Sequence, residues 1–171
     1  MRLLIVGTGA MARTHAQAFA EMDGAVLVGA VDLNEKALVS FADEFQIEKR
    51  FGSLDDAIAW GGFDAACNVT PDAIHHRTTM PLLAAGKHVL CEKPLASNFG
   101  DAADMVNAAR AAGVVNMVNL SYRNVPAVIA AAQMVAAGEI GAVRHFEASY
   151  LQSWLTQAHE PAARGSAGLP A

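Results

Sequence analysis

Short apolar runs alternate along the chain with longer segments of helical spacing, and this alternation restricts the fold more than any other feature. Residues 3–6 are continuously apolar, which is typical of a strand that is covered on both faces of a parallel sheet. Further strands are predicted at 25–31, 63–69, 88–91 and 114–120. Helices are predicted at 10–22, 34–45, 71–85 and 101–112, with another that begins after Ser53. The alternation predicts an α/β fold with a doubly wound parallel sheet.

The pattern changes after about residue 120. An alanine-rich helix is predicted at 125–137, and residues 142–151 then alternate in character, with Phe146 and Tyr150 on one face. This period of two predicts a half-buried strand of a different sheet. Residues 158–171 have no periodicity and are predicted to be a tail. We therefore expect a first domain at 1–120 and the incomplete start of a second, α+β domain at 121–171.

Charge and composition exclude several classes of function. The 12 basic residues are scattered and the net charge is −5, whereas a nucleic-acid surface needs clustered Lys and Arg. No apolar run reaches the roughly 18 residues that span a bilayer. Cys67 and Cys91 end apolar runs without metal-ligand spacing, so we expect buried, unreactive thiols and no metal site. These features favour a soluble, cytoplasmic protein.

A glycine-containing turn follows the first predicted strand and opens the first helix. It has the pattern G-x-G-x-x-A, in the sequence Gly7-Thr8-Gly9-Ala10-Met11-Ala12. In this context the first glycine permits a tight turn, the second lets a pyrophosphate approach the backbone, and the small residue at 12 allows close packing. The exposed N–H groups and the helix dipole favour an anion. The alternative is an ordinary tight turn between a strand and a helix.

Asp32 ends the second predicted strand, 23 residues after Gly9. A carboxylate at this place accepts hydrogen bonds from the ribose hydroxyls of a dinucleotide and repels a 2′-phosphate. Neither residue 33 nor residue 34 is basic, so the sequence favours NAD over NADP. The alternative is a solvated acid at the end of a strand.

Another candidate site follows the strand at 88–91, where Glu92, Lys93 and Pro94 come in succession. Ligands of open α/β sheets bind beyond the carboxyl ends of the strands. A lysine there can exchange a proton with a substrate hydroxyl while hydride leaves the same carbon, and Glu92 can hold the nicotinamide ribose. The alternative, from spacing alone, is a surface pair of opposite charges.

Four motifs, in their order and spacing, resemble the Gfo/Idh/MocA oxidoreductases, a family that includes glucose–fructose oxidoreductase and inositol dehydrogenases. They are the turn at 7–12, Asp32, the sequence Asn68-Val69-Thr70-Pro71 followed by His75, and the stretch Gly-Lys-His-Val-Leu-Cys-Glu-Lys-Pro at 86–94. The resemblance covers about residues 2–155. It implies a Rossmann fold and an NAD(P)-dependent dehydrogenase or reductase acting on a sugar, polyol or related hydroxyl or keto compound.

The resemblance also implies roles for single residues. Lys93 matches the catalytic lysine of the family, and Glu92 matches the acid that contacts the nicotinamide ribose. The residues that match the family's cofactor-binding positions are Gly7, Thr8, Gly9, Ala10, Met11, Asp32, Asn68, Thr70, Pro71, His75, Glu92, Lys93, Asn119 and Arg123. The Lys93–Pro94 peptide is expected to be cis. The sequence assigns no role to four of the six histidines, and His15 is one of these four.

The sequence departs from the family in its length. Members are roughly twice as long, and the Asp and His that their second domain contributes to the reaction are missing here, so we expect an incomplete enzyme of impaired activity. Truncation, a frameshift or a natural short form would each explain this. The alternatives are a non-catalytic dinucleotide-binding module and, less specifically, another nucleotide-binding fold such as a methyltransferase. The open edge of the strand at 142–151 is expected to dock on the first domain, to pair with a second copy in a homo-oligomer, or to fray.

Overall fold

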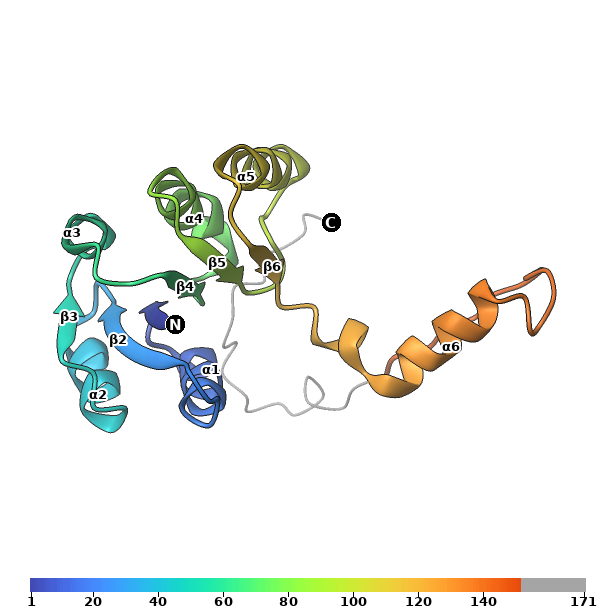
Figure 1. Ribbon diagram of the computed structural model, residues 1–171, viewed down its shortest axis with the longest axis horizontal. Coiled ribbons are helices and arrows are strands. Elements are labelled where there is room, and N and C mark those ends of the chain that lie inside the picture. Colours follow the sequence, from blue (N-terminus) through green and yellow to red (C-terminus); the bar gives the residue numbers. More distant parts are fainter. Residues whose placement is uncertain (152–171) are drawn as a thin grey trace, which may run out of the picture. The chain divides into compact units, whose positions relative to one another are not determined.

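The computed structural model describes residues 1–151. The chain divides into two compact units, Met1–Asn119 and Leu120–Ala171, and each is described by itself. The first unit holds a six-stranded, all-parallel sheet with the strand order β3-β2-β1-β4-β5-β6 (Figure 1). The strands are β1 (Arg2–Val6), β2 (Val26–Val31), β3 (Lys49–Phe51), β4 (Ala65–Asn68), β5 (His88–Cys91) and β6 (Asn116–Val118). The predicted doubly wound parallel sheet is therefore confirmed.

The order of the strands reverses between β1 and β4, where the two halves of the sheet meet. At such a switch point the connections leave in opposite directions, and a crevice opens at the carboxyl ends of the strands. The loops that follow β1, β2, β4, β5 and β6 all start from this edge, because all the strands are parallel. The fold thus gathers the sequence motifs of the first unit at one edge.

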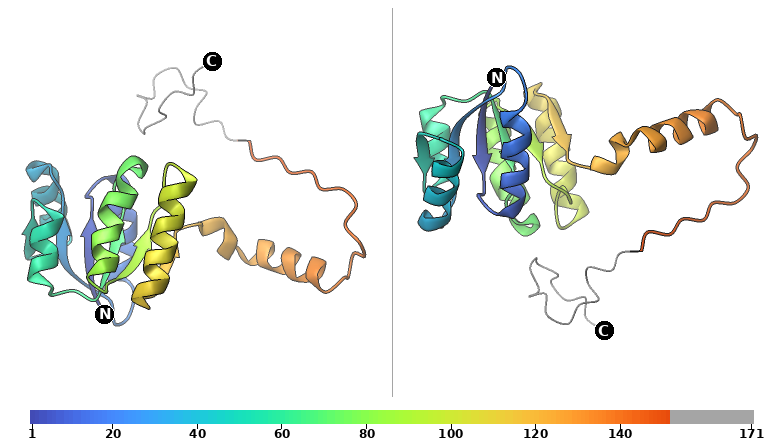
Figure 2. Two further views of the ribbon diagram at one scale, coloured as in Figure 1. Left: turned by 90° about the horizontal axis from the view of Figure 1, so that it is seen from above. Right: turned by 90° about the horizontal axis from the view of Figure 1, so that it is seen from below.

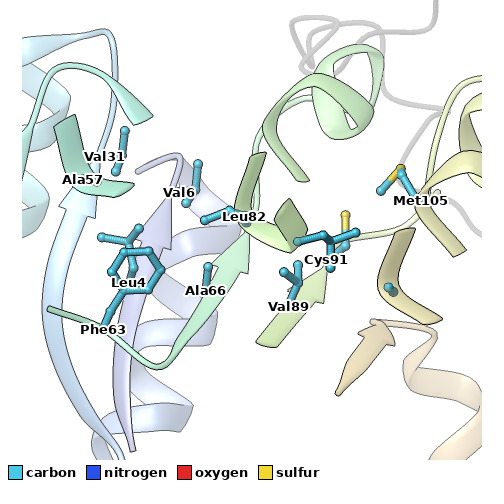
Figure 3. Packing of buried hydrophobic residues seen from close by; sticks show 12 residues of the cluster. Leu4, Val6, Val31, Ala57, Phe63, Ala66, Leu82, Val89, Cys91 and Met105 are labelled. Carbon is cyan, nitrogen blue, oxygen red and sulfur yellow. The ribbon is translucent and has the colours of Figure 1, made fainter. Parts of the chain in front are cut away.

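Five helices cover the two faces of the sheet. They are α1 (Ala10–Ala20), α2 (Glu35–Glu44), α3 (Leu54–Trp60), α4 (His75–Ala84) and α5 (Phe99–Ala112). Helices α3, α4 and α5 lie side by side on one face, whereas α1 and α2 cover the other (Figures 1 and 2). Consecutive residues of β1 serve opposite faces, since Leu4 and Val6 join the cluster under α3–α5 (Figure 3) and Ile5 joins the cluster under α1 and α2.

Side chains at the helix ends account for where several helices begin. The oxygens of Asn34, Ser53 and Asn98 accept hydrogen bonds from backbone N–H groups in the first turns of α2, α3 and α5. Such caps satisfy N–H groups that have no partner within the helix. The helices predicted at 34–45 and after Ser53 begin at two of these caps.

Both cysteines are free and buried, Cys67 within β4 and Cys91 at the end of β5. Burial raises the pKa of the Cys67 thiol to about 12 and that of Cys91 to about 11. Both thiols are therefore protonated at neutral pH, which suppresses the thiolate chemistry that oxidation and metal binding require.

The sequence did not predict β3, which is only three residues long. Lys49 and Arg50 are exposed, so this edge strand lacks the apolar run that marked the other strands. Before α4 the chain also makes a short 3₁₀ turn at Asp72–Ile74, which the predicted helix at 71–85 merged with the helix itself.

In the second unit, a 3₁₀ turn at Ser121–Asn124 leads into α6 (Pro126–Ala136), which agrees with the predicted helix at 125–137. The strand predicted at 142–151 was wrong: these residues form no strand and are exposed. A strand needs a neighbour to accept and donate its backbone hydrogen bonds, and the described part of this unit provides none. The predicted tail at 158–171 lies outside the described residues. Within residues 1–151, no helix is long and apolar enough to cross a membrane.

Candidate coenzyme and catalytic site

The turn between β1 and α1 contains two glycines, and a different structural reason accounts for glycine at each position. Gly7 has a φ of +92°, and a Cβ atom there would lie 3.0 Å from the Val69 carbonyl oxygen. Gly9 is the N-cap of α1 at an ordinary φ of −73°, and a Cβ atom there would meet nothing within 4 Å. Gly7 is thus required by the fold, whereas Gly9 faces open space at a helix N-terminus that favours an anion. Ala12 is fully buried, whereas Ala10 and Met11, which follow Gly9 in the first turn of α1, are exposed.

Asp32 follows β2 and is bound to this turn. Its Oδ2 accepts hydrogen bonds from the Thr8 N–H at 2.8 Å and from the Thr8 hydroxyl at 2.7 Å, and its Oδ1 accepts one from the Asn34 N–H at 2.8 Å. A carboxylate has about four acceptor positions. Three are used by the protein, which fixes the direction of the carboxylate and keeps acceptor capacity for a ligand hydroxyl.

The loop after β4 is organised by a buried amide. Asn68 Nδ2 donates to the hydroxyls of Thr78 at 2.7 Å and Thr79 at 2.8 Å, and its Oδ1 accepts from the Thr70 hydroxyl at 2.7 Å. Asn68 has no exposed surface, while Pro71 is exposed on the loop above it. The Asn68 side chain therefore shapes the loop from beneath.

His75, the first residue of α4, connects this loop to the turn after β5. Its Nε2 lies 2.7 Å from the Thr70 carbonyl oxygen and its Nδ1 lies 2.8 Å from the Pro94 carbonyl oxygen. The side chain is buried, with 1% of the residue exposed. The Lys93–Pro94 peptide is cis, as expected. Lys93 itself is exposed, and within residues 1–151 its ammonium group has no hydrogen-bond partner.

Glu92 is the buried acid of the site, with 7% of the residue exposed. Its Oε1 accepts a hydrogen bond from Asn119 Nδ2 at 2.6 Å and lies 2.8 Å from His15 Nε2, and its Oε2 accepts from the Lys93 N–H at 3.0 Å. Burial on its own would raise the pKa of Glu92, but the hydrogen bonds from Asn119, His15 and Lys93 outweigh it and lower the pKa below its usual range. Glu92 is therefore a fixed anion at neutral pH.

The predicted positions of the first unit form a continuous series of contacts along the carboxyl edge of the sheet. The series runs from Asp32 to Thr8 and then, through the hydrogen bond from the Val69 N–H to the Val6 carbonyl oxygen, to Thr70. It continues through His75 to Pro94 and along the chain to Lys93 and Glu92, which Asn119 and His15 contact. Gly9 and Lys93 therefore lie on loops of the same edge. Arg123 belongs to the second unit, so this series does not include it.

His15 is the functional candidate that sequence reasoning missed. It lies on α1, three residues after Ala12, and it brings an imidazole to Glu92 from a helix 77 residues away in sequence. The spacing from Ala12 was an available signal, because residues three apart share one face of a helix. Its acidic partner was not visible without the fold.

An open helix N-terminus with a carboxylate at the end of the next strand fits a dinucleotide, as does the strand order 3-2-1-4-5-6. No group of three or more potential metal ligands occurs in the part of the chain that the structure describes. The class that these features define is a dinucleotide-binding Rossmann domain. The model of the oxidoreductase family with an NAD-binding Rossmann fold, GFO_IDH_MocA, matches residues 1–120, and the chain belongs to this family. The resemblance inferred from the four motifs is thereby confirmed, and NAD is the cofactor that the family description carries.

The relatives that the chain matches include sugar and polyol enzymes. The chain is 35% identical over 157 residues to a 1,5-anhydro-D-fructose reductase of Ensifer adhaerens, which covers 88% of this chain and 47% of the relative. It is 31% identical over 152 residues to an NADP(+)-linked scyllo-inositol 2-dehydrogenase of Bacillus subtilis, covering 89% and 46%. The chain thus spans about half the length of these relatives.

Solved structures agree with the fold. The WlbA dehydrogenase of Bordetella pertussis, in complex with NADH and UDP-GlcNAcA, matches with a TM-score of 0.77 and 32% identity, over 82% of this chain and 43% of that one. A scyllo-inositol dehydrogenase of Lactobacillus casei, with bound NAD(H) and scyllo-inositol, matches with a TM-score of 0.76 and 27% identity, over 82% and 42%.

Proposed function

We propose that this chain is the coenzyme-binding part of an NAD-dependent dehydrogenase or reductase that acts on a sugar, a polyol or a related hydroxyl or keto compound. The observation that carries the proposal is the open helix N-terminus at Gly9 on the same sheet edge as the Glu92–Lys93 turn. This arrangement supports an anion site and a proton-transferring lysine on loops of the same edge, with the loop after β4 between them. The proposal also places the chain in the cytoplasm, where a dehydrogenase meets its coenzyme.

In this proposal the loops have separate tasks. The N–H groups at the start of α1 bind the diphosphate, with Gly7, Gly9, Ala10 and Met11 forming the surface of the turn. Asp32 accepts the hydroxyls of the adenosine ribose, and Thr8 holds its carboxylate. Thr70 and Pro71 line the coenzyme, and Asn68 and His75 position their loop. Glu92, held by Asn119, binds the nicotinamide ribose. Arg123 remains a proposed contact from the second unit.

Lys93 carries the proposed proton transfer. The bound coenzyme supplies the chemistry of hydride exchange at a carbon of the substrate. As a neutral amine, Lys93 Nζ takes the proton of the substrate hydroxyl in oxidation, and as an ammonium group it returns a proton in reduction. Its exposure and its lack of a protein partner within residues 1–151 leave the ammonium group available to a substrate.

The two glycines of the turn give the sharpest test of coenzyme binding. Gly9→Ala adds a methyl group into open space at an allowed φ, so the chain should fold with a loss of at most about 1 kcal/mol. The same methyl occupies the place of the diphosphate, and the Kd for NADH should rise at least about tenfold. Isothermal titration with NADH and urea unfolding measure the two quantities.

Gly7→Ala is the matched comparison, because it places the same methyl 3.0 Å from the Val69 carbonyl oxygen at a positive φ. It should lower the free energy of unfolding by about 1–3 kcal/mol. Wild-type chain that binds neither NADH nor NADPH, or Gly9→Ala that binds NADH unchanged, would refute the proposed site.

A turnover screen with sugars and polyols separates the proposed enzyme from a non-catalytic module. NADH binding without turnover by the chain favours the module. Turnover that disappears in Lys93→Met, while the Kd for NADH stays within about twofold, supports the proposed proton transfer. Turnover that survives in Lys93→Met removes Lys93 from the mechanism.

A further inference from the structure

The contacts of His75 require an unusual distribution of hydrogen. Both ring nitrogens face backbone carbonyl oxygens, Thr70 at 2.7 Å and Pro94 at 2.8 Å. A carbonyl oxygen only accepts hydrogen bonds, and a neutral imidazole has one N–H and one lone pair. In the neutral form, one of these contacts would therefore bring two lone pairs together at hydrogen-bond distance. Both contacts are favourable only when both nitrogens donate.

The lengths of the two contacts suit a cationic ring. Charge-assisted N–H···O bonds measure about 2.7–2.9 Å, and both contacts fall in this range. The residue is 1% exposed, so water does not replace either partner. His75 begins α4, and a helix N-terminus disfavours positive charge. Burial and the helix N-terminus both disfavour the positive charge, and the two charge-assisted hydrogen bonds to carbonyl oxygens oppose both effects.

We propose that His75 carries hydrogen on both ring nitrogens and, as an imidazolium, ties the loop after β4 to the turn that carries Lys93. It is a positioning residue: one N–H holds Thr70, in the loop proposed to line the coenzyme, and the other holds Pro94, next to the proposed proton-transferring lysine. The protonation state is independent of the proposed function. The expected effect of His75 on coenzyme binding rests on the proposed function.

The protonation state is measured directly on the coenzyme-free 171-residue chain. In a ¹⁵N-detected histidine spectrum at neutral pH, both nitrogens of His75 should give the shift of a protonated nitrogen, and His75→Gln assigns the signals by their loss. A single protonated nitrogen overturns the proposal. The spectrum gives this answer whether or not the chain binds NADH. A failure of the proposed protonation state is therefore distinguishable from a failure of the proposed function.

The tie itself is tested by NADH titration. His75→Gln keeps donors at only one position and should raise the Kd for NADH about tenfold. His76→Gln is the matched control on the same helix, because His76 Nε2 only approaches Asp104 Oδ2, at 3.8 Å, and its Kd should stay within about twofold of wild type. Equal effects of the two variants would contradict the tie.

Chemical rescue distinguishes a two-donor tie from simple filling of space. In His75→Gly, 4-methylimidazole should restore NADH affinity, whereas 1-methylimidazole should not. The two molecules are isomers of equal size, but the protonated 1-methyl isomer has a single N–H. Equal rescue by both, or by neither, would overturn the two-donor tie, and thermal unfolding confirms that the glycine variant is folded before the test. If it is not, the ¹⁵N spectrum of the wild type decides.

Discussion

Glu92 receives its hydrogen bonds from three separate parts of the chain: α1 through His15, its own turn through the Lys93 N–H, and the end of β6 through Asn119. A buried carboxylate with this many donors stabilises the folded state only while it is ionised. Its charge therefore links the pH of the solution to the stability of the site.

Glu92→Gln should lower the free energy of unfolding by about 1–3 kcal/mol at neutral pH, because the amide replaces a charged acceptor. The pKa of Glu92 is lowered in the folded state, so its contribution is fully present above the ordinary glutamate range. It is lost as pH falls through that range and below. The variant and the wild type should thus approach each other in stability in acid, as urea unfolding at pH values on either side of the range will show.

The exposed Glu48 provides the matched control for this pH dependence. Glu48→Gln should leave both the stability and its pH profile almost unchanged, since surface substitutions usually change stability by less than about 0.5 kcal/mol. A Glu92→Gln profile that runs parallel to the wild type down to acid pH would contradict the assigned role of the charge.

Sequence reasoning placed Gly7, Gly9, Asp32 and Lys93 at one edge of a sheet because each follows a strand or lies in a motif that requires one. It did not find the tie at His75 or the contact between His15 and Glu92. These contacts join groups that lie 19 and 77 residues apart in the sequence, and no local sequence pattern indicates such a contact.

Among the elements, α3 offers the clearest single-residue test of stability. Ser53 Oγ accepts the Asp56 N–H at 3.2 Å and donates to Asp56 Oδ2 at 2.8 Å, which closes the first turn. Ser53→Ala should lower the free energy of unfolding by about 1 kcal/mol, measured by urea unfolding. Ser40→Ala, at an exposed interior position of α2, should be neutral or slightly stabilising. Equal losses in the two variants would show that the cap is not responsible.

Sequence patterns predicted best the strands in the interior of the sheet, which helices cover on both faces. The strand at 88–91 was exact, since its apolar residues lie between two layers of helices. β3 was missed because an edge strand of three residues buries too little to need an apolar run. The prediction of a strand at 142–151 was wrong. Alternating apolar and polar residues indicate only that a strand could have one apolar face, while a strand also needs a neighbouring strand to pair with.

Across the described chain, the core belongs to the first unit. Every buried residue among residues 1–151 lies at or before Ala109, whereas all described residues from Ser121 on are exposed. A fragment of residues 1–119 should therefore unfold cooperatively, with a midpoint within about 5 °C of the full chain. It should still bind NADH, with a Kd that rises only by the loss of the proposed Arg123 contact. Calorimetry and titration check both expectations. A fragment without a cooperative transition would show that the second unit contributes to the core.

The same fragment should be less prone to self-association. The second unit exposes large apolar side chains, which include Phe146 at 82% and Leu151 at 92%. Contacts between copies through residues 142–151 remain our proposal for such an oligomer. Light scattering at increasing concentration should detect association of the 171-residue chain and a monomer for residues 1–119.

The series of contacts from Asp32 to Glu92 is complete before residue 120. Recombination between genes at this junction would therefore replace everything downstream without breaking any of these bonds. The proposed coenzyme site would then keep its geometry whatever sequence follows residue 119.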